Sequence, residues 1–230
     1  METGEYLPSH DEDLVDGEKL DPTEVIGPPR GLIERADAFL TEIEHAGPNL
    51  SPKDCVGLFD SIAELRFTDW GKVDILWTPE RRLKVDATSR ELYTRLRAQL
   101  DIHPRKLLET LETGIRELVG KVGAGLEHHA EIRRTYAEPW EHNPSYEFIN
   151  DVIFPFDTLG YVLELMRDLS IVPGDGTRTS VRDLDRTMRL SLPEIAEEFR
   201  RGGDSIDPVA PDMYPESFWW MRLPGAKPIL

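Results

Sequence analysis

The stretch GLEHHAEIRR, residues 125–134, is the densest group of side chains in the sequence that could perform acid–base chemistry. His128 and His129 lie there among glutamates and arginines within about three turns of a helix. His129 falls on the apolar side of that helix, one turn after Gly125, so a small gap could lie in front of its ring. A histidine beside a gap can act as a general base or a metal ligand. Packing of His129 in the core is the alternative interpretation.

Arg97 and His103 form a second candidate pair for catalysis. The two residues, separated by five others, resemble the Arg-and-His pattern of HEPN-type helical ribonucleases, and Ala98 stands where that family usually has a polar residue. The resemblance implies an RNA-cleaving pair in a helical bundle that dimerises. The sequence contains no P-loop and no GxGxxG, GxSxG or HExxH motif. The sequence therefore favours a protein that is not an enzyme, and it predicts no cofactor and no metal site.

A run of arginines indicates a site for anions. Arg178, Arg182, Arg186 and Arg189 follow one another by four, four and three residues, which places them on one face of a helix. A phosphate, the chain's own acidic tail or the carboxylates of another protein could lie along this face. Solvated salt bridges within the chain are the alternative. Nucleic acid is not an expected partner except along this face, because the net charge of −17 repels phosphates elsewhere.

Four large apolar residues, Phe218, Trp219, Trp220 and Met221, stand side by side near the end of the sequence. Such a run matches neither the period of a strand nor that of a helix, so another surface must cover some of these side chains. The surface belongs either to the body of this chain or to a partner protein, where aromatic residues are often binding hot spots. Membrane contact is not expected, because the segment lacks a basic face.

The composition describes a soluble, acidic chain with a sizeable core. Residues 1–29 hold nine acidic residues against Lys19 alone, so nearly half of the excess negative charge is in one tail. Cys55 is the only cysteine, and its apolar neighbours predict a buried, unreactive thiol. The start METGEYLPSHDEDL has no secretory signal and no apolar run approaches 18 residues, so the expected compartment is the cytoplasm. A homo-oligomer remains open.

Apolar spacing predicts helices along most of the chain, with one interruption. Alternation of Val73, Ile75 and Trp77, and of Leu83 and Val85 after a turn, indicates a small β-hairpin. Seven helices are predicted, over residues 32–46, 52–65, 86–100, 104–136, 144–169, 180–190 and 191–201. The fourth is either straight or kinked near 120–125, and the fifth is broken at Pro155, with Asp157 as the cap of its continuation. The last two are separate elements, because Ser191 and Glu194 indicate a new start. The fold class is therefore all-α or nearly so, a bundle of about seven helices over residues 30–202 between an acidic tail (1–29) and a proline-rich aromatic tail (203–230).

These features favour an interaction protein over a catalyst. We expect a regulatory, inhibitory or accessory subunit of a protein complex, of the kind that antitoxins, immunity proteins and defence complexes represent. The acidic tail and the aromatic residues would be its contact surfaces. The alternative is a helical nuclease or nucleotide hydrolase that uses His129 or the pair Arg97 and His103.

Overall fold

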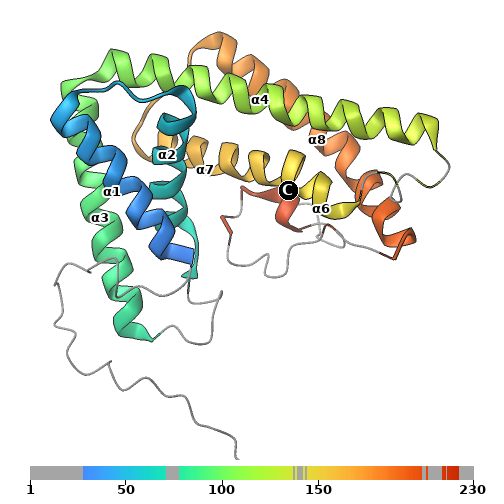
Figure 1. Ribbon diagram of the computed structural model, residues 1–230, viewed down its shortest axis with the longest axis horizontal. Helices are drawn as coiled ribbons and strands as arrows, with labels where there is room; N and C mark the ends of the chain where they lie inside the picture. Colours follow the sequence, from blue (N-terminus) through green and yellow to red (C-terminus); the bar gives the residue numbers. More distant parts are fainter. Residues whose placement is uncertain are drawn as a thin grey trace, which may run out of the picture.

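The computed structural model describes residues 28–70, 78–136, 138, 142, 144–203, 206, 214, 215 and 217–222. Every regular element within these ranges is helical, which confirms the all-α class (Figure 1). The elements are α1 (Pro28–Ala46), α2 (Pro52–Phe67), α3 (Pro79–Ile102), α4 (Pro104–Thr135), α6 (Ser145–Phe148), the π-helix η4 (Ile149–Ile153), α7 (Phe154–Asp168), α8 (Asp175–Arg201) and the 3₁₀ helix η6 (Trp219–Arg222). The predicted acidic tail lies, up to residue 27, outside the described residues.

The helices α1, α2 and α3 pack together at one end of the molecule (Figure 1). Ser51 caps α2 as its spacing predicts, because its hydroxyl accepts the backbone N–H of Asp54 at 3.1 Å. Cys55 is fully buried in this group, and burial raises the pKa of its thiol to about 12. The thiol is therefore protonated and unreactive at neutral pH.

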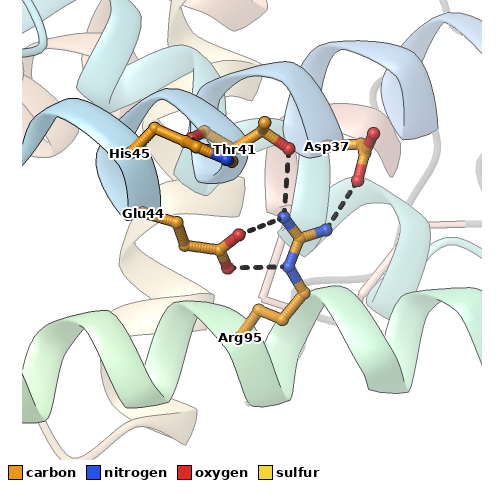
Figure 2. Close-up of polar contacts among 5 residues, drawn as sticks. All are labelled: Asp37, Thr41, Glu44, His45 and Arg95. Carbon is orange, nitrogen blue, oxygen red and sulfur yellow. Dashed lines mark hydrogen bonds and ion pairs between the residues drawn. The ribbon is translucent and has the colours of Figure 1, made fainter.

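Arg95 ties α3 to α1 (Figure 2). Its Nε and Nη2 donate to the two carboxylate oxygens of Glu44, each at 2.9 Å, and its Nη1 donates to Asp37 at 2.6 Å. Nη2 also donates to the hydroxyl of Thr41 at 3.2 Å. A guanidinium that is held by two carboxylates in this fork geometry fixes how the two helices cross.

The predicted β-hairpin is not confirmed. Leu83 and Val85 lie in the first turns of α3, where Val85 is buried and Leu83 is 52% exposed, as expected for neighbouring faces of a helix. Thr78 caps α3 by accepting the N–H of Arg81, and Pro79 occupies the first turn. These start signals outweigh a short alternation of apolar residues. The other half of the predicted hairpin, residues 71–77, lies outside the described residues.

The long helix α4 is the spine of the fold. It has 32 residues, about 48 Å of helix, and it packs against α2, α7, η4 and α8 (Figure 1). It is an uninterrupted helix through residues 120–125. A Cβ on Gly114 would lie 2.5 Å from the Pro52 carbonyl oxygen, and one on Gly125 would lie 2.7 Å from Val152 Cγ2. Because Val152 occupies the space beside Gly125, the gap that the sequence predicts near His129 is filled.

Two predicted helix breaks are wrong. Pro155 does not end a helix, because the wide turn η4 precedes it: the N–H of Phe154 bonds to the carbonyl of Ile149, five residues earlier. Asp157, the predicted cap of a new helix, lies inside α7 instead.

The break predicted near Ser191 is also absent, so the predicted sixth and seventh helices are one helix, α8, with Pro193 in its interior. The buried residues Leu184, Met188, Leu192, Ile195 and Phe199 form one apolar face along it. Packing of this face compensates for the hydrogen bond that Pro193 cannot donate. The predicted total of about seven helices is therefore not confirmed. No helix in the described ranges is both long and apolar enough to cross a bilayer.

Candidate functional site

The aromatic segment near the end of the chain docks on α7. Phe218 is 1% exposed and Trp220 is 7% exposed. The Phe218 ring stacks on Trp220 with 4.7 Å between centroids and meets the Tyr161 ring at 4.8 Å, while Trp220 meets Phe156 at 4.4 Å. Gly160 gives these rings room, since a Cβ there would lie 2.8 Å from Phe218 Cζ. The body of the chain therefore covers these two side chains.

The two indole N–H groups attach this segment to α7 and α8. Trp219 Nε1 donates to Asp185 of α8 at 2.9 Å, and the guanidinium of Arg189 stacks on the Trp219 ring at 4.5 Å. Trp220 Nε1 donates to Asp157 of α7. The segment thus bridges two helices with paired polar groups as well as apolar contact. The side chain of Met221 lies outside the described residues.

A cavity of about 340 Å³ opens between α7, α8 and this segment, and we call it the tail groove. Its apolar walls are Leu159, Gly160, Leu163, Val181, Phe218 and Trp220. Arg178, Arg182, Glu164 and Asp185 also line it. The groove therefore brings together two of the arginines and two of the aromatic residues that the sequence singles out.

The two carboxylates of the tail groove are already bound by neighbours. Glu164 accepts from Arg167 through one oxygen and from the hydroxyl of Ser217 through the other. Asp185 accepts the indole N–H of Trp219 through Oδ1 and Arg189 Nε, at 2.8 Å, through Oδ2. These carboxylates position the aromatic segment and Arg189.

The arginines of α8 differ in what they bind. Arg178 is paired with Asp175 in the first turn of the helix. Arg182 and Arg186 have neither a hydrogen bond nor an ion pair with the part of the chain that the structure describes, and both are exposed. Within the described residues, the stripe that the sequence predicts is therefore paired at its two ends, Arg178 and Arg189, and has no ion pair at its centre.

Three carboxyl groups lie close together beneath the docked segment: Asp60 of α2, which is buried, and Glu64 of α2 and Asp157 of α7, which are half-buried. Burial raises the pKa of Asp60 to about 6, although Arg35 opposes the change. Burial and the neighbouring Asp60 raise the pKa of Glu64 to about 7. Burial also raises the pKa of Asp157 well above its usual range, more than the Trp220 N–H lowers it. The cluster is ordinary in sequence, and only the packing of α2 against α7 reveals it.

His129 is a core residue in this structure. It is 1% exposed, and its ring meets Phe148 at 5.1 Å and Phe199 at 5.6 Å between centroids. Nε2 lies 3.5 Å from an oxygen of Glu198, and burial lowers the pKa of the ring. The neutral form is therefore favoured among the aromatic rings.

Arg97 and His103 lie outside the tail groove and outside a second cavity between α2, α4 and the start of α7. Arg97 is exposed on α3, and His103 is the junction between α3 and α4, where its N–H bonds to the Gln99 carbonyl at 2.8 Å. The residues lining the tail groove, and those lining the second cavity, of about 380 Å³, include neither of them and do not include His129. The catalytic roles of all three stay predictions.

The tail groove combines residues that the sequence singles out with residues that it does not. Arg182, Phe218 and Trp220 stand out by type and spacing, whereas Leu163 has no local signal. Gly160, within the apolar run LGYVL, was one signal of a close approach on α7. No family model, curated protein or solved structure matches this chain.

Proposed function

We propose that this chain is an interaction protein, a regulatory, inhibitory or accessory subunit that binds another protein in the cytoplasm. Its contact surface would be the arginine face, which we define as Arg178, Arg182, Arg186 and Arg189 of α8. One observation carries the proposal: Arg182 and Arg186 make no ion pair within the described residues of a chain with a net charge of −17. Exposed guanidiniums that no carboxylate of the described residues holds can bind carboxylates of a partner.

A protein partner suits this face better than a nucleic acid does. Asp175, Asp183 and Asp185 lie among the arginines along α8. Together with the net charge, they repel a continuous row of phosphates. A folded partner can instead place single carboxylates opposite the two unpaired arginines and avoid the aspartates between them.

Charge reversal at the face tests this proposal. Arg186→Glu should remove a partner that co-purifies with the tagged chain from its native cells. It should leave the fold intact, because Arg186 is exposed and has no hydrogen bond or ion pair within the described residues. Arg90→Glu on α3 is the matched control, because Arg90 is also exposed and has no ion pair in the described part of the chain. Quantitative mass spectrometry of the two co-purified sets gives the readout.

The salt dependence gives a second readout. Binding that rests on exposed charges should weaken as ionic strength rises, because the Debye length falls from about 10 Å at 0.1 M salt to about 3 Å at 1 M. A partner that Arg186→Glu and Arg90→Glu retain equally would contradict the proposal. If the only species that Arg186→Glu loses is a second copy of this chain, seen as a change in sedimentation, the protein is a homo-oligomer rather than a subunit of a mixed complex.

A further inference from the structure

The tail groove has the size and lining of a site for a small ligand. Its volume of about 340 Å³ lies within the range of ligand pockets. Because a water molecule occupies about 30 Å³ in the liquid, the groove has room for roughly ten non-hydrogen atoms. Carbon atoms of Leu159, Leu163, Val181 and the rings of Phe218 and Trp220 form most of its surface. The body of the ligand is therefore apolar.

The polar group of the ligand must be complementary to Arg182. Of the four charged residues in the groove, Glu164, Asp185 and Arg178 are bound to neighbours within the chain. Arg182 has no such partner in the described part of the chain. A guanidinium presents a fork of N–H donors that matches the two oxygens of a carboxylate. An apolar ligand with a carboxylate at one end satisfies both the walls and Arg182.

The neighbouring carboxylates limit the ligand to one negative charge. The carboxylates of Glu164 and Asp185 line the groove and hold Ser217 and Trp219 in place. A dianionic phosphate would meet their repulsion with only one unpaired cation to offset it. We infer that the tail groove binds an aliphatic monocarboxylate, a fatty acid of about eight to ten carbons, with its chain against Phe218 and Trp220 and its carboxylate on Arg182.

This site is separable from the protein partner proposed above. Arg182 belongs to both the tail groove and the arginine face, whereas Arg186 belongs only to the face. Arg182→Gln and Arg186→Gln are therefore a matched pair, because each removes one exposed, unpaired guanidinium of the same helix. Only Arg182→Gln should weaken binding of the fatty acid.

Titration calorimetry with the full chain tests the inference, with sodium hexanoate, octanoate and decanoate below their micelle concentrations and 1-octanol as the uncharged probe. Affinity should rise about fourfold for each added methylene until the groove is full. Arg182→Gln should weaken octanoate binding roughly fivefold and leave 1-octanol binding unchanged. Arg186→Gln should leave both unchanged.

Four results would overturn the inference: no binding of octanoate or decanoate at millimolar concentration, equal binding of octanoate and 1-octanol, equal weakening by the two variants, or tighter binding of N-acetyl-leucyl-leucine than of octanoate. The last result would make the occupant a peptide carboxyl terminus. The proposed function fails separately if a protein partner still co-purifies with Arg186→Glu while the chain still binds the fatty acid.

Discussion

Gly160 lies where α7 and the aromatic segment touch, so replacing it with alanine is a direct probe of the docked rings. In an open helix interior, Gly→Ala stabilises by about 1 kcal/mol. At Gly160 the new Cβ would lie 2.8 Å from Phe218 Cζ and 2.9 Å from Trp220 Cη2, well inside the usual carbon contact of about 3.5–4.0 Å. Overpacking of this kind costs about 1–3 kcal/mol, so the net change should be a loss of up to about 2 kcal/mol.

Gly123→Ala on α4 is the matched control. Gly123 is also half-buried in a helix interior, but nothing lies within 4 Å of its Cβ position. Gly123→Ala should raise the free energy of unfolding by about 1 kcal/mol, which raises the melting temperature by about 2–4 °C for a chain of this size. Thermal unfolding, followed by circular dichroism and tryptophan emission, should therefore give Gly160→Ala a free energy of unfolding about 1–3 kcal/mol lower than that of Gly123→Ala. The tryptophan emission of Gly160→Ala should be shifted to the red. If the two variants unfold at the same temperature with unchanged emission, Phe218 and Trp220 do not dock against Gly160.

Three further predictions use the same stability assays. Trp220→Ala should destabilise the fold by about 3–5 kcal/mol and expose tryptophan to quencher, because it empties the space against Phe156; an unchanged stability would refute docking. Arg95→Lys should lose about 1–3 kcal/mol despite its retained charge, since lysine cannot hold Glu44 through two N–H groups, and equal stability would contradict this. The folded pKa of Asp60 is raised from 3.8 to about 6, so its contribution to stability is fully present below pH 4 and is lost as pH rises to about 6. Asp60→Asn should therefore reduce the change of the urea unfolding midpoint with pH over that window. At pH 7 it should raise the free energy of unfolding by up to roughly 3 kcal/mol.

Local signals were enough for some of the helix starts. Ser51 with Pro52, and Pro104, mark the starts of α2 and α4 in both the sequence and the structure, because capping and the fixed φ of proline act within a few residues. The same kind of signal misled where packing opposes it. Pro155 predicts a break, and Ser191 with Glu194 predicts a new helix start. In the structure the π-helix η4 precedes Pro155 without a break, and the buried face of α8 continues past Ser191.

The candidate site, too, could be predicted from the sequence only in part. Spacing placed Arg182 and Arg186 on one face of a helix, and composition showed that the aromatic run needed a cover. Which arginine stays unpaired depends on where Asp175 and Asp185 point, and that is a property of the folded chain.

The sequence alone determined the helical class, the acidic charge, the arginine spacing and the need to hide Phe218 and Trp220, since each follows from residue type or from a period of a few residues. Only the tertiary structure decided what hides them and what lies beside them. Asp185 is 34 residues from Trp219 in the sequence, and Asp157 is 63 residues from Trp220; Gly160, which contacts Trp220, lies within the same range of separation. A contact over such a separation is set by how α7 and α8 pack rather than by any local pattern.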